Sequence, residues 1–368
     1  MLDTIQIMQY RARANVPRAQ AELENRLLDR LELPLLGIHN EKLYLTAVSH
    51  LEQKATELRI IYDQLPKRRN TTEYIILDSY ASATIEGART TVEKVRESFQ
   101  APVTKDDRMV VNTVIGSKYA YGRCITRKNL RTLWEKVTDG VCENKHLDGA
   151  LYRSGMVEIG NSGETVHTPA PVEKLPELME QWFCYREQDS SLIGSFVAHF
   201  YFVYVHPFCD GNGRTARIIN ASSLYHAGWD KIKSLPLSSS INKNIHGYYR
   251  SLEDSEIPLK GKNGYWLDLS PFVSYMLDTF EQCLIDAALS NNKLTPNEQK
   301  LLERMDRVKG NAEITVKKAA VILNLSESAA RNTLQNLVNK GYLRVNTEET
   351  PFVYSLEPKL TPNYLPKE

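Results

Sequence analysis

The feature that most constrains this chain is a stretch of twelve residues, His206 to Arg217, with the sequence HPFCDGNGRTAR. An apolar run over 193–205 predicts a buried helix before it. The His–Pro step ends that helix, because the residue before a proline is pushed out of helical geometry. Residues 211–213 (Gly-Asn-Gly) allow a tight turn whose backbone N–H groups face one point. A second helix is expected from about Arg214, because apolar residues then recur at helical spacing.

Two arginines stand at the start of this second helix, where the helix macrodipole is already positive. Arg214 and Arg217 are three residues apart and share a helix face. Each cation in a first turn costs about 0.3–1 kcal/mol, so the pair favours a bound anion. A phosphate suits both the N–H groups of the turn and the guanidinium forks. The alternative is an ordinary glycine loop with two solvated arginines, which would leave the fixed spacing of His206, Asp210 and Asn212 without a reason.

The twelve residues resemble the full HPFx(D/E)GNGRxxR signature of Fic-domain proteins, with no departure at a defined position. Enzymes of that family mostly transfer AMP from ATP to a hydroxyl of a target protein. The resemblance implies that His206 takes the proton of a Tyr, Thr or Ser hydroxyl and that Asp210 holds Mg²⁺. It implies that Asn212 and the loop N–H groups steady the α-phosphate while the arginines hold the β- and γ-phosphates. The implied ATP-binding set on the turn and helix is Asp210, Gly211, Asn212, Gly213, Arg214, Thr215 and Arg217.

A second unfavourably placed charge lies upstream, at the end of a helix expected over about 71–87. Glu86 is a carboxylate in the last turn, where the macrodipole is negative, and Ser82 lies four residues earlier on the same face. The stretch resembles the (S/T)xxxE(G/N) inhibitory motif of many Fic proteins, whose glutamate pairs with the second arginine of the signature, here Arg217. The resemblance implies that Glu86 lies in the ATP site and restrains the enzyme. The alternative is a frayed glutamate at the surface.

A β-hairpin is expected between Met156 and Thr168, with a turn over 160–163. It resembles the Fic flap, whose edge strand holds a target peptide by main-chain pairing, and we expect ATP contacts from Val166 and His167. A plain surface hairpin would have the same pattern. In the family a tyrosine pair packs against the adenine, and the matching residues here are Tyr248 and Tyr249. Two tyrosines in a helix are also typical of core packing.

We expect a mainly α protein with a Fic helical core, a β-hairpin flap and a small C-terminal winged-helix domain. A chain of 368 residues is long enough for two or three domains. The expected division is an N-terminal helical region over 1–105 that includes the inhibitory helix, a catalytic core over 106–289 and a winged helix over 290–368. A helix with one apolar stripe is expected over 44–65, from Tyr44 to Leu65.

The winged-helix prediction rests on three helical patterns near 295–305, 315–323 and 327–340, followed by a hairpin of 342–345 and 352–356. Polar residues face outward from the third helix and could read bases. The segment 294–350, however, carries nine basic and seven acidic residues, a net charge of only +2, and DNA-binding surfaces are usually more basic. DNA and a protein therefore both remain candidate partners for this domain. The outward residues are Arg331, Asn332, Gln335, Asn336 and Lys340.

Composition narrows the class of protein. The 46 basic and 45 acidic residues give a net charge of +1, which argues against nucleic acid or membrane as an obligatory partner. No apolar run approaches the roughly 18–20 residues of a transmembrane helix, and the N-terminus has no signal-peptide pattern. The five cysteines contain no C-x-x-C pair, so reduced thiols in a cytoplasmic protein are expected. Whether the chain forms a homodimer is left open.

The sequence thus predicts a protein adenylyltransferase that uses ATP and Mg²⁺, modifies a target protein and itself, and is restrained by Glu86. One alternative keeps the fold but removes AMP from a modified target, with Glu86 orienting a water molecule. Another alternative is a transcriptional regulator whose winged helix binds DNA and whose nucleotide site acts as a sensor. Loss of Glu86 should raise AMP transfer, and loss of His206 should abolish it.

Overall fold

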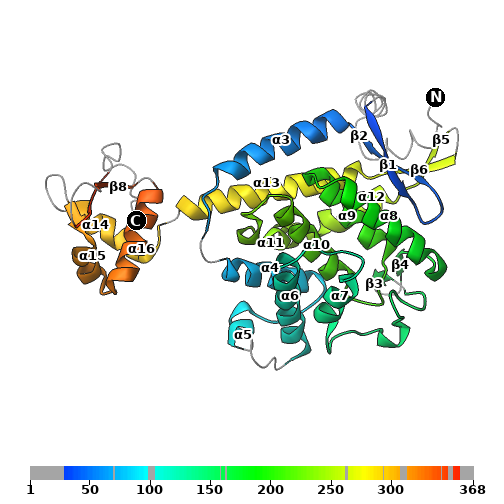
Figure 1. The fold of residues 1–368 in the computed structure, drawn as a ribbon, viewed down its shortest axis with the longest axis horizontal. Helices are drawn as coiled ribbons and strands as arrows, with labels where there is room; N and C mark the ends of the chain where they lie inside the picture. The colour runs from blue at the N-terminus through cyan, green and yellow to red at the C-terminus, as the bar shows by residue number, and fades with distance from the viewer. Residues whose placement is uncertain are drawn as a thin grey trace. The chain divides into compact units, whose positions relative to one another are not determined.

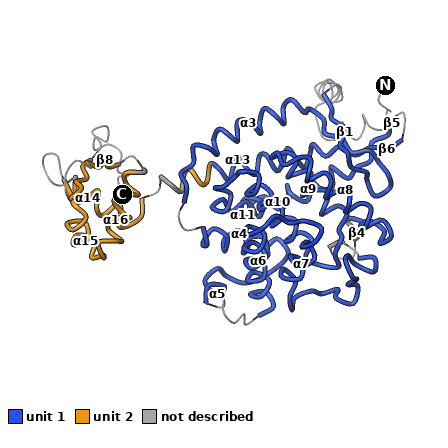
Figure 2. The backbone as a smooth tube through the Cα atoms, viewed as in Figure 1, with its two compact units in different colours: residues 1–284 blue, residues 285–368 orange. Residues whose placement is uncertain are grey.

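A computed structural model describes residues 29–356 of the chain. Within that range it leaves out residues 69–70, 98–103, 158, 162–163, 262–263, 293, 307–312, 341 and 347–350. The chain divides into two compact units, 1–284 and 285–368 (Figure 2). The predicted boundary at 105/106 lies inside the first unit and stays a prediction.

The first unit is mainly helical, as predicted (Figure 1). Its helices cover most of the chain between 48 and 292, and the last of them runs past the boundary of the unit. The helices are α3 (Val48–Gln64), α4 (Thr72–Ile85), α5 (Val92–Glu97), α6 (Lys105–Tyr121), α7 (Leu130–Thr138), α8 (Leu175–Gln188), α9 (Leu192–Val205), α10 (Asn212–His226), α11 (Leu237–Lys243), α12 (Ile245–Ser255) and α13 (Ser270–Asn292).

Helices α9 and α10 form the centre of this unit. α9 is buried on all sides, as expected for a helix without a polar face, and the Ser191 side chain caps it by accepting a hydrogen bond from Gly194 N. α10 packs against α9, α6 and α4 (Figure 1). The twelve-residue motif therefore lies at the turn between two core helices, within reach of α4.

A four-stranded sheet was not predicted. It consists of β1 (Arg30–Leu36), β2 (Lys42–Thr46), β6 (Gly264–Asp268) and β5 (Leu259–Gly261) in that order, with β2 parallel to β6. Tyr44, assigned above to a helix, belongs to β2, and α3 begins only at Val48. The helix prediction was wrong there because buried Leu43 and Leu45 face one way and Tyr44 packs edge-on against Trp266 with ring centroids 5.3 Å apart.

The second unit contains its own hydrophobic core. Thr315 Oγ1 caps α15 by accepting a hydrogen bond from Lys318 N. Its three helices and final hairpin follow one another in the predicted order, and they are α14 (Pro296–Asp306), α15 (Val316–Leu323), α16 (Glu327–Asn339), β8 (Leu343–Asn346) and β9 (Val353–Leu356). Strand β7 (Glu313–Thr315), which precedes α15 and pairs with β9, was not predicted. That this unit is a winged helix stays a proposal.

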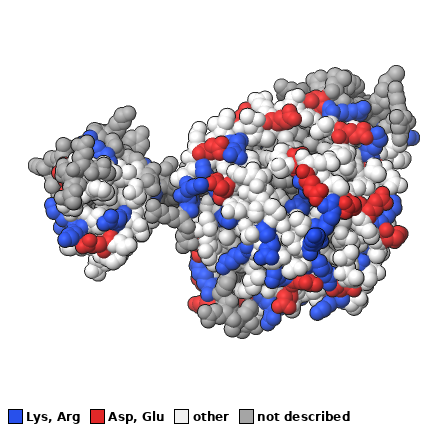
Figure 3. Space-filling model, viewed as in Figure 1, with Lys and Arg blue, Asp and Glu red and all other residues white. Residues whose placement is uncertain are grey.

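Charge is mixed on the face of the molecule shown in Figure 3, where acidic and basic side chains alternate over the first unit. In the part of the chain that the structure describes, no helix is both long enough and apolar enough to cross a membrane.

Candidate active site

His206 ends α9 in an unusual backbone conformation. Its φ of 54° and ψ of 62° are left-handed, a region that costs a residue with a side chain roughly 1–2 kcal/mol. The imidazole Nδ1 lies 3.2 Å from the carbonyl oxygen of Val203. Because a carbonyl can only accept, this contact assigns the hydrogen to Nδ1 and leaves Nε2 as the basic nitrogen. The ring is therefore set up as a base.

The surroundings of His206 also keep it neutral. Burial lowers its pKa to about 3, and the charges of His167 and Arg153 act in the same direction. This value lies below the ordinary 6.5 of a histidine. The imidazole is therefore unprotonated throughout the neutral range, as a proton acceptor must be.

The loop after His206 is held by side chains of its own. Asn212 Oδ1 accepts from Phe208 N at 3.0 Å, and Asn212 Nδ2 donates to Phe208 O at 2.8 Å. The Asn212 side chain thus braces the loop, and its contact with the α-phosphate stays a prediction. Gly211 has a φ of 73°, and a Cβ there would lie 2.6 Å from Thr138 Cγ2, so only glycine fits this turn.

Asp210 is fixed by backbone N–H groups. Its Oδ1 accepts from Gly211 N at 2.5 Å and its Oδ2 from Glu143 N at 3.1 Å. The described residues contain no group of three or more His, Cys, Asp or Glu side chains that could hold a metal ion. Mg²⁺ commonly binds through one or two carboxylates together with waters and substrate phosphates. Asp210, whose oxygens keep unused lone pairs, fits a Mg²⁺ ion that arrives with a nucleotide.

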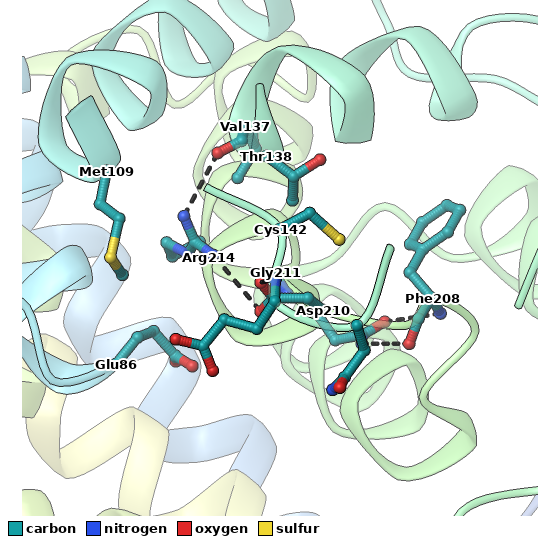
Figure 4. Close-up of polar contacts among 12 residues, drawn as sticks. Glu86, Met109, Val137, Thr138, Cys142, Phe208, Asp210, Gly211 and Arg214 are labelled. Carbon is teal, nitrogen blue, oxygen red and sulfur yellow. Dashed lines mark hydrogen bonds and ion pairs between the residues drawn. The ribbon is translucent and has the colours of Figure 1, made fainter. Parts of the chain in front are cut away.

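The two arginines of the motif are both buried. Arg214 Nη1 donates to Val137 O at 3.2 Å and Nη2 lies 3.5 Å from Asp210 Oδ1 (Figure 4).

Thr215, predicted to bind ATP, is fully buried, and its hydroxyl has no hydrogen-bond partner among the described residues. Its side chain belongs to the protein interior, which corrects that prediction.

Arg217 meets Glu86, the acidic residue at the end of α4. Arg217 Nη2 lies 2.6 Å from Glu86 Oε1 and 2.9 Å from Ser82 O, and Arg217 Nε donates to Ser82 Oγ at 2.8 Å. The Glu86 carboxylate also lies against the first turn of α10, because a Cβ placed on Gly213 would collide with Glu86 Oε1. The structure thus brings together Ser82, Glu86 and Arg217, and the carboxylate occupies the helix N-terminus where the sequence predicted a phosphate.

The flap is a short hairpin of β3 (Ile159–Asn161) and β4 (Glu164–His167). It is shorter than predicted. Val166 lies in β4, but its side chain is outside the described part of the structure. The His167 ring lies between Glu256 Oε2, 2.6 Å from Nδ1, and Tyr204 O, 2.8 Å from Nε2. Both nitrogens of His167 are therefore engaged within the protein, which corrects its predicted contact with ATP.

The two tyrosines of α12 have different surroundings. Tyr248 is 2% exposed and its hydroxyl lies 3.0 Å from His199 Nε2, so it is a core residue and not the predicted adenine contact. Tyr249 is 44% exposed and its hydroxyl donates to Ile85 O at 3.3 Å. Only Tyr249 presents a surface beside Glu86.

Arg153 is the site residue that the sequence analysis missed. It precedes the expected hairpin and forms only an isolated bridge with Asp148. Its side chain is 2% exposed and its Nε donates to His206 O at 2.8 Å. No periodicity or motif marks such a residue, because its partners are backbone carbonyls from distant segments.

Comparison with known proteins agrees with this geometry. Residues 125–224, which include the whole motif, match the Fic/DOC family. This part of the chain is thus similar to a Fic domain, as the resemblance implied.

Proteins named protein adenylyltransferase Fic are similar to it. The one from Nematostella vectensis is 27% identical over 298 residues, which cover 75% of this chain and 66% of that protein. The one from Drosophila mojavensis is 27% identical over 252 residues, which cover 64% of this chain and 46% of that protein. The chain thus spans between about half and two thirds of the length of these relatives.

Two solved structures share the fold. A Fic family protein from Desulfovibrio desulfuricans has a TM-score of 0.56 at 23% identity, covering 86% of this chain and 97% of that one. A Fic domain containing signaling protein from Bacteroides thetaiotaomicron has a TM-score of 0.51 at 18% identity, covering 64% and 95%. These likenesses confirm the predicted fold class, a mainly helical Fic fold.

Proposed function

We propose that this protein transfers AMP from ATP to a Tyr, Thr or Ser hydroxyl of a target protein, and to itself, under restraint by Glu86. The observation that carries the proposal is the turn between α9 and α10. It holds an unprotonated imidazole nitrogen on His206 beside a helix N-terminus that carries two buried arginines. The relatives named protein adenylyltransferase Fic support the same reaction.

The reaction assigns a role to each end of the turn. His206 Nε2 takes the proton of the target hydroxyl while the hydroxyl oxygen attacks the α-phosphorus. The bond from that phosphorus to the bridging oxygen breaks and pyrophosphate leaves. The first turn of α10 and the guanidinium groups of Arg214 and Arg217 hold the phosphates. Asp210 would hold Mg²⁺, which supplies positive charge to the phosphate oxygens.

Glu86 restrains this site in the proposal. Its carboxylate takes one donor of Arg217 and lies against Gly213, so a phosphate in the same place meets a like charge. The side chain of Glu86 is 30% exposed, whereas that of Arg217 is 3% exposed. The restraining carboxylate is thus the member of the pair that can leave.

Intact mass spectrometry after incubation with ATP and Mg²⁺ tests the proposal. Glu86→Gly should gain an AMP adduct roughly 10- to 100-fold faster than the wild type, since a hydrogen bond to a charged group contributes about 1.5–3 kcal/mol. Glu73→Gly is the matched control, because Glu73 is a carboxylate of the same helix that pairs with Arg96 at the other end. Equal amounts of adduct in the wild type and both variants would contradict the proposed restraint by Glu86. No adduct in any of the three proteins would contradict the proposed AMP transfer.

A second activity is supported by one observation at the same place. The partly exposed Glu86 carboxylate, at the start of α10, could orient a water molecule toward an AMP group already attached to a target. The wild type would then remove AMP from a protein modified by the Glu86→Gly variant. Release of AMP from that modified protein by the wild type, but not by Glu86→Gly, distinguishes removal from transfer.

The second unit is proposed to be a winged helix that binds a partner. Arg331, Asn332 and Asn336 are exposed on α16. Lys340, predicted to face outward, instead pairs with the buried Glu298 at 2.6 Å, which removes one cation from a DNA-binding face and favours a protein partner. Fluorescence anisotropy with a mixed-sequence DNA duplex at two salt concentrations decides the class, since DNA binding weakens steeply with salt.

We place this activity in the cytoplasm. All five cysteines are free in the structure. The Sγ atoms of Cys142 and Cys209 lie 3.6 Å apart without a bond, as is typical of a reducing compartment. This placement is tested by lysing cells under acid quench and labelling the free thiols of the protein. All five cysteines should be labelled.

A further inference from the structure

The C-terminal end of α9 is held by a set of donors that the proposed reaction does not use. The last carbonyls of a helix have no partners within it. Tyr204 O accepts from His167 Nε2 at 2.8 Å, and His206 O accepts from Arg153 Nε at 2.8 Å. Pro207 O accepts from the backbone N–H of Arg153 at 2.9 Å. Two of these three carbonyls are thus bound by one residue.

The guanidinium of Arg153 has no carboxylate partner. Its Nη1 donates to Gly155 O at 3.0 Å and its Nη2 donates to Ala170 O. No ion pair joins it to an acidic group among the described residues, and burial lowers its pKa. A buried cation without a counter-ion is costly, so packing alone would favour an apolar side chain here. Its place at the negative end of α9 lowers that cost.

The fork of Arg153 joins three pieces of backbone. Gly155 precedes the flap hairpin, Ala170 follows it, and His206 begins the motif turn. A residue in the left-handed region persists only when its surroundings hold it there. The bond to His206 O, with the one to Pro207 O, fixes the carbonyls on both sides of the His–Pro step. The direction of the His206 side chain follows from that backbone.

We infer that Arg153 is a positioning residue, which keeps the His206 backbone left-handed and so keeps Nε2 in place as the base. This inference rests on the proposed transfer of AMP. A lysine cannot replace the arginine, because an ammonium group lacks the planar fork that reaches three carbonyls in fixed directions. The expected loss is therefore in the position of the base and not in the binding of ATP.

The first test reads His206 directly, without any activity. Long-range ¹H–¹⁵N NMR of the histidine rings at pH 6 should show His206 neutral with the hydrogen on Nδ1 in the wild type. Arg153→Lys should shift His206 to a mixture of tautomers. Arg186→Lys is the matched control, since Arg186 is another arginine bound only by neutral oxygens, Ile125 O at 3.1 Å and Ser223 Oγ at 2.9 Å. An unchanged His206 spectrum in folded Arg153→Lys overturns the inference.

The second test measures AMP transfer in the Glu86→Gly background. Arg153→Lys should lower kcat roughly 100-fold with the KM for ATP unchanged, because a misplacement of about 1 Å costs that much, while Arg186→Lys keeps kcat. A rise of KM alone, or equal losses in both variants, overturns the inference. A Glu86→Gly protein without AMP transfer would contradict the proposed function. The NMR experiment would still show whether Arg153 positions His206.

A failure to fold is also decisive. If Arg153→Lys does not fold, Arg153→Gln keeps a donor on a shorter stem and replaces it in both tests. Failure of both variants to fold, while Arg186→Lys folds, assigns Arg153 to stability alone and rejects the positioning role.

Discussion

The motif turn joins two helix ends that are held in opposite ways. At the C-terminal end of α9 the helix dipole is negative, and buried donors from Arg153 and His167 bind its carbonyls. At the N-terminal end of α10 the dipole is positive, yet the start of this helix carries the cations Arg214 and Arg217. The first arrangement has the sign that the macrodipole favours, and the second has the opposite sign.

This difference separates a permanent part of the site from an exchangeable one. The end of α9 is complete without a ligand, because its donors come from the fold itself. The start of α10 is balanced by Asp210 of the motif itself, 3.5 Å from Arg214, and by Glu86, which belongs to another helix and is partly exposed. An anion from outside can take the place of Glu86, whereas nothing from outside is needed to hold His206. We therefore expect regulation at the start of α10 and fixed chemistry at the end of α9.

Removing the base should have the largest effect. His206→Asn in the Glu86→Gly background should lower kcat for AMP transfer by roughly 10²–10⁴-fold, the usual contribution of a general base. Asparagine tolerates the left-handed backbone, so the thermal midpoint should change little. The matched control is His226→Asn at the far end of α10, whose ring lies 3.0 Å from Ala120 O. Full activity without His206 would show that another group takes the proton.

Lowering the pH should destabilise the protein through two histidines of α9 and its C-terminal end. The pKa of both His206 and His199 is about 3, in each case lowered mainly by burial. The unfolded chain therefore binds these protons first, near pH 6.5, and the free energy of unfolding falls as pH drops from 6.5 toward 3. Each histidine contributes about 1 kcal/mol per pH unit in this window. Urea unfolding at pH 7 and pH 5 measures the fall, which His206→Asn should reduce. An equal fall in both proteins would contradict the low pKa of His206.

Because Glu86 contacts Gly213, the substitution Gly213→Ala should change the stability in opposite directions in the wild type and in the Glu86→Gly variant. In the wild type, Gly213→Ala places a Cβ against Glu86 Oε1 and should destabilise by about 1–3 kcal/mol. In the Glu86→Gly background the obstacle is gone, and alanine should stabilise α10 by about 0.5–1 kcal/mol through its helix propensity. Thermal unfolding of the four proteins measures the difference. The same sign in both backgrounds would mean that the carboxylate does not lie at the start of α10.

The contrast between the two ends also explains what the sequence could predict. The start of α10 was found because its charges disagree with the helix dipole, and such a conflict is visible in the order of residues. Glu86 was marked by the same reasoning, but its pairing with Arg217, more than a hundred positions away, came from the resemblance to the inhibitory motif.

The end of α9 could not be found in this way. Its donors agree with the dipole, and they come from Arg153 and His167, which bind carbonyls of this helix end that carry no sequence signal. The ligand contacts expected of the Thr215 and Tyr248 side chains disagree with the structure for a related reason. A motif records which residues are present, while burial decides whether a side chain faces a ligand or the core.

The smallest effect is expected from Ser82, which supports the restraint without forming it. Its hydroxyl accepts from Arg217 Nε at 2.8 Å. Ser82→Ala leaves that donor unpaired, which costs roughly 1–3 kcal/mol and loosens Arg217 from α4. AMP transfer should then rise about 10-fold, less than in Glu86→Gly. The control is Ser79→Ala, one turn earlier in the same helix, because Ser79 is equally buried and its hydroxyl has no hydrogen-bond partner among the described residues. Equal rates of AMP transfer in Ser82→Ala and Ser79→Ala would show that Ser82 does not contribute to the restraint. In that case α4 holds Arg217 through the Glu86 carboxylate alone.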